Sequence, residues 1–420
     1  MRNGLTFLIA AKRCETAGLQ QLVITSDLVM ATADLIHALQ RERGLSSLYL
    51  GAKANHPMSE LGAQIQTTAA SEQHLRLCLE RLDLDPLQPA NGARLYNRIA
   101  FVLHGLESLP ELRQTVAAQA MDAAQATSAY MRLVAGLLAV VFEAADTAGD
   151  PDVSRRLVAL FNFMQGKELA GQERATGSAM YAGGVAEQAS QQRLAHLIDS
   201  QERCLEVFLD FAPEPAKALW AAASRSQSLT DLERLRRVLC TAPQGGALNP
   251  AMGLVWFGVC SDRMDDMRQV EVALAQGLLQ LSTAKMAQAL KELAELEKLA
   301  QSGTPGSGAT AAAFSTAADD PPDAPTQAPG SQLDRSILAL VQDQARRLQA
   351  VNEELENVRT SLNERKLIER AKGLLMAHRQ LTEEDAHKTM RQMAMNQNRR
   401  LIDVAKAVLT MAEVLPIPDR

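Results

Sequence analysis

The sequence has few features of a secreted, membrane-spanning or metal-binding protein. Its 420 residues include only five cysteines, which are scattered, odd in number and never spaced as Cys-x-x-Cys. This usage indicates a reduced, cytoplasmic compartment. No window approaches ~20 uncharged apolar residues, so we expect no membrane span. The seven histidines form no His-x-His or His-x-x-x-His pair, so we expect no metal site.

Sequence motifs for catalysis are also missing. The chain contains no nucleophile elbow, no P-loop and no glycine-rich dinucleotide fingerprint followed by a suitable acid. We therefore expect no catalytic residues, no cofactor and no enzymatic activity.

Aromatic residues are scarce, at 4%, although apolar residues make up 47% of the chain. Alanine, leucine, glutamine, glutamate and arginine dominate, and these residues favour helices. Apolar residues recur at spacings of three and four, as in Leu28, Ala31, Leu35 and Leu39, and no alternating β pattern persists. The fold class is predicted to be all-α, and 420 residues are too many for one ordinary core. Residues 1–300 are expected to form a body of two helical bundles.

The composition changes sharply after this body. Residues 301–331 are rich in Gly, Ser, Pro, Thr and Ala, which predicts a flexible linker that cannot form a core. Residues 332–362 then carry apolar residues at heptad spacing, from Ile337 to Leu362. This pattern favours a short coiled coil and hence a homodimer. The alternative is a single amphipathic helix that packs on its own body.

The last segment, residues 363–420, differs in charge from the rest. Nine basic residues and five acidic residues lie between Glu364 and Arg400, a local charge of +4 in a chain of net charge −6. Helical spacing predicts three short helices. Their expected apolar positions are Leu367, Ile368, Ala371, Leu374 and Leu375 on the first, Ala386, Met390, Met393 and Ala394 on the second, and Leu401, Val404, Ala405 and Val408 on the third. A basic module on an acidic body indicates contact with a polyanion.

The runs IERAKGLLM, LTEEDAHKTMRQMAM and NQNRRLIDVAKAVL, in this order and spacing, resemble an ANTAR domain. That family is a helical RNA-binding module of bacterial transcription antiterminators. The resemblance implies that a dimer binds paired hairpins in leader mRNA and prevents a terminator from forming. The candidate RNA-binding residues are Lys366, Arg370, Lys372, Gly373, Arg391, Asn398, Arg399 and Arg400. On residue types alone, DNA in a major groove or a merely solvated basic surface remains open.

Two fragments of the body look alike. HALQRERGLSSLYLG covers residues 37–51 and GKELAGQERATGSAMYAGG covers 166–184, so that Glu42-Arg43 and Glu173-Arg174 lie 131 residues apart. The repetition suggests an internal duplication in which each bundle presents arginines. A planar guanidinium donates in a fork, which suits a flat oxyanion better than the point charge of lysine.

These fragments resemble the NIT domain, a nitrate- and nitrite-sensing module whose two helical bundles bind the anion between them. The resemblance implies nitrate or nitrite as the effector ligand. The candidate ligand-binding residues are Arg41, Arg43, Arg174, Arg263, Gln40 and Gln172. Arg41 and Arg43 are about 200° apart on a helix, so only one of them can face the ligand. The alternative is that Arg43 and Arg174 pair with Glu42, Glu168 or Glu173 and only pin the helices together.

Taken together, the two resemblances imply a nitrate- or nitrite-responsive antitermination regulator that binds RNA. The alternative function is a helical signalling sensor whose C-terminal coil binds a protein partner instead of RNA.

Overall fold

The computed structural model describes residues 4–51, 58–82 and 92–302 of the body. Near the C-terminus it describes residues 367–368, 371, 374–375, 383–397 and 400–414. Most of the predicted linker and the whole predicted coiled coil (residues 332–362) lie outside the described residues. The predicted all-α class is confirmed, since the described residues contain helices and a single isolated bridge between Val185 and Ala247.

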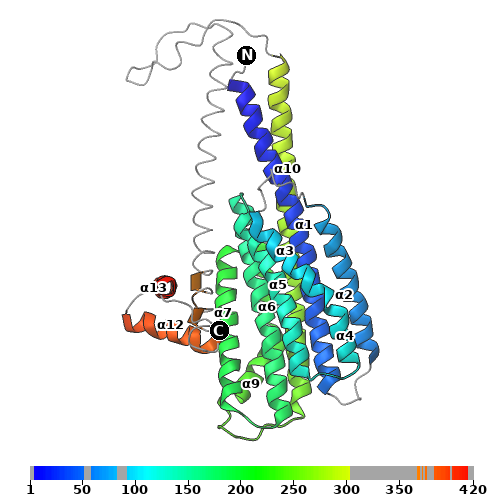
Figure 1. The fold of residues 1–420 in the computed structure, drawn as a ribbon, viewed down its shortest axis with the longest axis vertical. Coiled ribbons are helices and arrows are strands. Elements are labelled where there is room, and N and C mark those ends of the chain that lie inside the picture. Colours follow the sequence, from blue (N-terminus) through cyan, green and yellow to red (C-terminus); the bar gives the residue numbers. More distant parts are fainter. Residues whose placement is uncertain are drawn as a thin grey trace.

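The body consists of two consecutive sets of helices that pack side by side (Figure 1). The first set is α1 (Gly4–Gly51), α2 (Met58–Leu79), α3 (Gly92–Glu107), α4 (Leu109–Ala117) and α5 (Ala123–Thr147). The second set is α6 (Pro151–Gly183), α7 (Gln188–Phe211), α8 (Glu214–Ala223), α9 (Gln227–Thr241) and α10 (Met252–Ser302). The predicted breaks at residues 148–151, 213–215 and 241–250 coincide with the junctions α5–α6, α7–α8 and α9–α10, as their proline and glycine content predicts.

Local sequence explains the boundaries of α6, the helix at the centre of the body. Asp150 caps its N-terminus, because the Asp150 carboxylate accepts a hydrogen bond from the Val153 amide at 3.1 Å, and Pro151 occupies the first turn. The helix ends at Gly183, and Gly184 adopts the left-handed conformation with φ of 69°. Glycine adopts this conformation without the steric penalty of a Cβ atom.

One hydrophobic core runs through both sets of helices. Buried side chains from the first set, such as Leu35 and Val141, belong to the same cluster as Phe163 of α6 and Met267 of α10. A smaller cluster around Trp256 joins α6, α7, α9 and α10, and another around Leu61 joins α2 with α4 and α5. The two halves are therefore joined by a shared core.

The longest helices, α1 and α10, run antiparallel along each other (Figure 1). Lys12 pairs with Glu292 at 2.5 Å, and the hydroxyl groups of Ser26 and Ser282 lie 2.9 Å apart. Because the residue number on α10 falls as that on α1 rises, the first turns of α1 lie beside the last turns of α10.

The core also explains two strongly apolar helices. By length and composition alone, α1 and α5 are apolar enough to cross a bilayer, although charged residues interrupt both helices. However, 67% and 56% of their most apolar windows are buried inside the protein. Their apolar side chains pack against neighbouring helices, so the hydrophobic character of α1 and α5 is explained by their place in the core.

A buried polar network connects α1, α6 and α10. Lys167 is fully buried and donates to Glu271, and its Nζ lies 3.1 Å from Nδ1 of His37. Burial, followed by the positive charges of Lys167 and Arg268, lowers the pKa of His37 from 6.5 to about 2. His37 is therefore neutral in the folded protein and accepts a hydrogen bond from Lys167.

We expect this histidine to make the protein sensitive to acid. Below pH 6.5 His37 is protonated in the unfolded chain but stays neutral in the folded chain. Its contribution to the free energy of unfolding is therefore fully present above that pH and is lost as the pH decreases toward 2. One such group contributes a slope of about 1.4 kcal/mol per pH unit. Urea unfolding at pH 7, 6 and 5 should show a smaller loss for His37→Gln than for the wild type. His104→Gln, on the surface, should behave like the wild type, and equal slopes for all three proteins would rule the explanation out.

The C-terminal module contains α12 (Glu383–Gln397) and α13 (Leu401–Val414). Side chains of the two helices form a separate small core with residues that precede α12: Ala371, Met390, Ala394, Val404 and Ala405 are buried, and Ile368, Leu375, Met393, Leu401 and Val408 pack against them. Ala386 is also buried. The apolar positions predicted for the second and third helices are therefore confirmed.

Candidate functional site

A cavity of about 700 Å³ lies where the two halves of the body meet. It is lined by the C-terminal turns of α1 and α6 and by the N-terminal turns of α5 and α10, with Arg193 from α7. Most of the lining side chains are small: Gly44, Ser47, Gly51, Ala123, Ala124, Thr127, Ser128, Gly171, Ala175, Thr176, Ser178, Ala179, Ala182 and Gly253. Because these side chains are small, they leave a space between the helices, and two buried arginines, Arg43 and Arg174, are among the residues that line it.

Arg43 projects from α1 and is shared between a carboxylate and the cavity. Its Nη1 donates to Oε1 of Glu168 at 2.5 Å, and both side chains are almost fully buried. Its Nη2 is also buried but has no hydrogen-bond partner among the described residues. A buried, unsatisfied guanidinium N–H is costly, so its presence in the wall of a cavity indicates a place for an acceptor.

Arg174 projects from α6, and its hydrogen-bond partners among the described residues are neutral. Its Nη1 donates to Oγ of Ser261 at 2.9 Å and its Nη2 to the carbonyl of Gln40 at 3.4 Å, and its Cζ lies 4.6 Å from the ring centre of Phe257. No carboxylate among the described residues pairs with it. Burial, followed by the charge of Arg43, lowers the pKa of Arg174 to about 10. The group is therefore cationic at neutral pH and lacks a counter-ion.

Two glycines make room for these side chains in a reciprocal way. A Cβ atom on Gly44 of α1 would lie 2.6 Å from Nη2 of Arg174, which belongs to α6. A Cβ atom on Gly171 of α6 would overlap Nη2 of Arg43, which belongs to α1. Each helix therefore supplies one arginine and the glycine that accommodates the arginine of the other helix. The sequence contained a signal for this packing: a glycine inside a helix costs about 1 kcal/mol relative to alanine, which suggests that another group packs closely against the helix there.

The glutamates beside the two arginines point away from the cavity, into their own bundles. Arg113 of α4 donates to both oxygens of Glu42 at 2.8 and 2.9 Å, and Arg236 of α9 donates to both oxygens of Glu173 at 2.6 Å. These bidentate ion pairs fix the rotation of α1 and α6 about their axes. Because Glu42 and Glu173 are held inside their own bundles, the next residues along the chain, Arg43 and Arg174, are directed to the interface. Sequence reasoning missed Arg113 and Arg236, since nothing in the local pattern shows which distant helix faces Glu42 or Glu173.

Trp256 holds the segment of α6 that carries Arg174. The fully buried Trp256 ring packs directly on Gly177, and its Nε1 donates to the carbonyl of Arg174 at 3.0 Å. A side-chain hydrogen bond to a helix carbonyl ties α10 to α6 at the level of the cavity.

The other predicted ligand residues lie in different places. Gln40 and Gln172 both donate to Glu168, at 2.9 and 3.2 Å, and Gln172 also lines the cavity. Arg41 is exposed and is not part of the cavity wall. Arg263 is buried behind the wall, where it donates to Gln201 at 2.9 Å and lies 3.6 Å from Glu173. The structure thus brings Arg43, Arg174 and Gln172 together, with Gln40 adjacent, but not Arg41 or Arg263.

The hypothesis that the arginines only pin helices together is met in part. Arg43 does pair with Glu168, but Glu42 and Glu173 bind other arginines and Arg174 binds none of the three.

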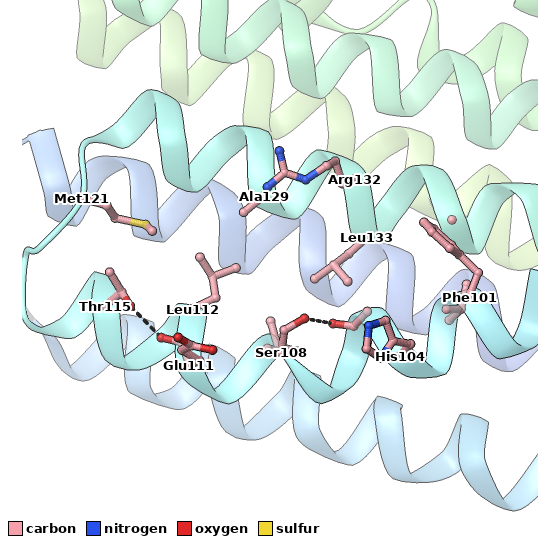
Figure 2. A pocket seen from close by; sticks show the side chains of 14 residues that line it. Phe101, His104, Ser108, Glu111, Leu112, Thr115, Met121, Ala129, Arg132 and Leu133 are labelled. Atoms are coloured by element: carbon pink, nitrogen blue, oxygen red, sulfur yellow. Dashed lines mark hydrogen bonds between the residues drawn. The ribbon is translucent and has the colours of Figure 1, made fainter. Parts of the chain in front are cut away.

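A second hollow, of about 390 Å³, lies between α3, α4 and α5 (Figure 2). Its wall is mainly apolar, with Phe101, Leu112 and Leu133 among its lining residues. The hydroxyl groups of Ser108 and Thr115 donate to carbonyls of Gly105 and Glu111, at 2.8 and 2.9 Å. This hollow lacks buried cations, so it does not share the chemistry of the first cavity.

The C-terminal module presents basic side chains on its surface. Arg391 on α12 is exposed, and so is Arg400, whose carbonyl accepts the first hydrogen bonds of α13. The other candidate RNA-binding residues, Lys366, Arg370, Lys372, Gly373, Asn398 and Arg399, lie outside the described residues. For those six the RNA-binding role stays a prediction.

A helical body with a cationic cavity at the joint of its two halves, followed by a small basic helical module, defines a ligand-responsive regulator. Comparisons with known proteins agree with this class. A family model described as nitrate and nitrite sensing (NIT) matches residues 34–279, and an ANTAR domain model matches residues 356–409. A nitrate regulatory protein of Klebsiella oxytoca is 34% identical over 403 residues, which cover 96% of this chain and 93% of that protein.

A solved structure of the NasR transcription antiterminator has the same fold. It is 31% identical in sequence, superposes with a TM-score of 0.61, and the match covers 97% of this chain and 99% of the other. The chain therefore belongs to the nitrate- and nitrite-sensing family, in the form that carries a C-terminal ANTAR domain. It is a transcription antiterminator of this type and a regulator rather than an enzyme, as the sequence predicted.

Proposed function

We propose that nitrate or nitrite binds in the cavity between α1 and α6, through Arg43 and Arg174, and that its binding frees the ANTAR module for leader mRNA. One observation carries the proposal: two buried guanidinium groups meet at the joint of the bundles, one with an unsatisfied Nη2 and the other without a carboxylate. A planar oxyanion placed between them would accept from both groups. Gln172 supplies a neutral amide in the same wall.

Anion binding at this joint acts on the arrangement of the two halves. Arg43 belongs to the first half and Arg174 to the second, so an anion held by both favours the arrangement in which they converge. A ligand shifts such an equilibrium only by its difference in affinity for the two states. We further propose that the predicted linker, most of which lies outside the described residues, acts as a tether that allows large displacement but transmits little torque, as its glycine- and proline-rich composition predicts. Release of a masked module is therefore the mechanism that this chain favours.

The RNA step relies on the basic residues of the module. Arg391, Arg400 and the six residues outside the described ranges neutralise phosphates, and the target is a pair of leader hairpins whose binding prevents terminator formation. We further propose that residues 332–362 form a coiled coil, so that a homodimer places two modules on the paired hairpins. The regulator acts in the cytoplasm, where its RNA is made.

Calorimetry on the full chain tests the anion site. Nitrate and nitrite should bind, with chloride and sulfate much weaker, and Arg174→Met should reduce nitrate affinity at least about thirtyfold, because it removes a buried charge-assisted contact. Arg132→Met, at an exposed arginine of the second hollow, is the matched control and should bind as the wild type does. Equal weak heats for all four anions would refute the site.

A gel shift with a labelled RNA that carries two adjacent hairpins tests the RNA step. Nitrate should strengthen the shift, added salt should weaken it, and the Arg391→Ala, Arg400→Ala double variant should reduce it. Nitrate binding without any RNA shift would instead favour the alternative, a sensor whose C-terminal coil binds a protein partner.

A further inference from the structure

The carboxylate of Glu168 lies in the middle of the polar groups around the cavity. Oε1 of Glu168 accepts from Arg43 at 2.5 Å and from Gln172 at 3.2 Å, and Oε2 accepts from Gln40 at 2.9 Å. Its side chain is only 4% exposed. All three donors are candidate ligand residues, so the protein's own carboxylate already uses part of the donor set that an anion would use.

The charges around the cavity leave a single unbalanced positive charge. Glu168 offsets one of the two buried guanidinium groups, Arg43 and Arg174, and the other guanidinium has no counter-ion among the described residues. The other buried cations on the neighbouring helices have carboxylate partners of their own: Arg113 pairs with Glu42, Arg236 with Glu173 and the exposed Glu233, and Lys167 with Glu271, while Arg263 lies 3.6 Å from Glu173. Arg193 lines the cavity but is exposed to solvent, which screens its charge.

The geometry at Arg43 allows Glu168 and a ligand to be held together. Glu168 takes Nη1, whereas Nη2 is buried and unsatisfied. A ligand can therefore bind Nη2 while Glu168 keeps its place. One carboxylate and one bound anion then balance two guanidinium groups, which is the neutral state that a buried site requires.

We propose that Glu168 is the specificity-determining residue of this site, because its fixed negative charge restricts the cavity to a single monovalent anion. A divalent oxyanion of similar size would leave an uncompensated negative charge beside Glu168. The inference rests on the proposed anion site and adds to it a reason for charge selectivity that Arg43 and Arg174 alone do not provide.

The test compares nitrate with sulfate in the full chain carrying Glu168→Gln. The variant keeps an oxygen acceptor for Arg43 but raises the charge of the site by one. Nitrate should bind about tenfold tighter, and sulfate should gain more than nitrate because its charge is larger, so the nitrate-to-sulfate affinity ratio should fall at least about tenfold. Glu143→Gln, at another buried acid that pairs with arginines away from the cavity, should leave that ratio unchanged. An unchanged ratio in Glu168→Gln would overturn the proposal.

A second variant covers the case in which Glu168→Gln does not fold. Gln172→Glu adds a carboxylate at the wall of the cavity and makes the site neutral, whereas Gln172→Met removes the same amide without adding charge. Nitrate affinity should be at least about tenfold lower in Gln172→Glu than in Gln172→Met, and equal affinities would overturn the proposal. If the wild type itself binds no nitrate, the anion site fails; if the wild type binds and these variants keep its selectivity, only the role of Glu168 fails.

Discussion

Replacing Gly171 with alanine should weaken nitrate binding strongly while the helical body stays folded. The new Cβ atom would occupy the place of Nη2 of Arg43, a buried guanidinium nitrogen that has no hydrogen-bond partner among the described residues. Since that nitrogen is the end of a flexible side chain, it can move aside, and the helix gains about 1 kcal/mol from alanine. Nitrate affinity should fall at least about thirtyfold, the equivalent of ~2 kcal/mol for a lost buried charge-assisted contact.

Calorimetry with circular dichroism as a fold check would measure this effect. Gly44→Ala should behave in the same way, because its Cβ atom would lie 2.6 Å from Nη2 of Arg174. Gly166→Ala is the matched control, since it lies on the same helix as Gly171 and its Cβ atom would meet Cys204 at an ordinary 3.5 Å. Wild-type affinity in both Gly171→Ala and Gly44→Ala would show that the two arginines do not hold the anion.

Replacing Lys167 with methionine should destabilise the protein more than any other single change proposed above. Lys167 and Glu271 are both fully buried, and Glu271 would keep only Arg268, at 3.4 Å. Burial lowers the pKa of Lys167, against the opposing effect of Glu271. The pair thus exists at a desolvation cost, and breaking it leaves a buried carboxylate poorly compensated, which costs about 3 kcal/mol or more.

Urea unfolding followed by circular dichroism would measure the loss. The double variant Lys167→Met, Glu271→Leu should recover most of the stability, because two apolar groups need no compensation. Lys285→Met removes a partly exposed lysine that pairs with Asp150 and Asp152, and it should cost about 1 kcal/mol or less. A loss for Lys167→Met no greater than that for Lys285→Met would contradict the explanation.

The fold was largely predictable because helical spacing records which residues face a core. The apolar positions of α12 and α13, including Met390, Ala394 and Val404, could be named from the sequence and are buried as expected. Spacing also showed that Arg41 and Arg43 could not face the same way, and Arg43 is the one in the cavity wall. Periodicity is a local property, and these predictions needed only local information.

The candidate site was predictable only in part, because it depends on which distant helices meet. The sequence suggests Arg263 as a further ligand residue, but Arg263 contacts Gln201 and Glu173 and does not line the cavity. Arg113 and Arg236 gave no local signal, although they set the direction of the Glu42-Arg43 and Glu173-Arg174 pairs. Pairings over 71 and 63 residues are decided by tertiary packing, which no single-sequence period contains.

The antiparallel contact of α1 with α10 has a consequence for how this sensor can be reused. Lys12 and Arg13 pair with Glu292 and Glu297, so the chain enters and leaves the body at the same end. A domain whose ends lie together can be inserted into a host protein without stretching the host chain. Residues 4–302 could therefore be grafted as a cassette into a surface loop of a reporter enzyme without separating the two ends of that loop.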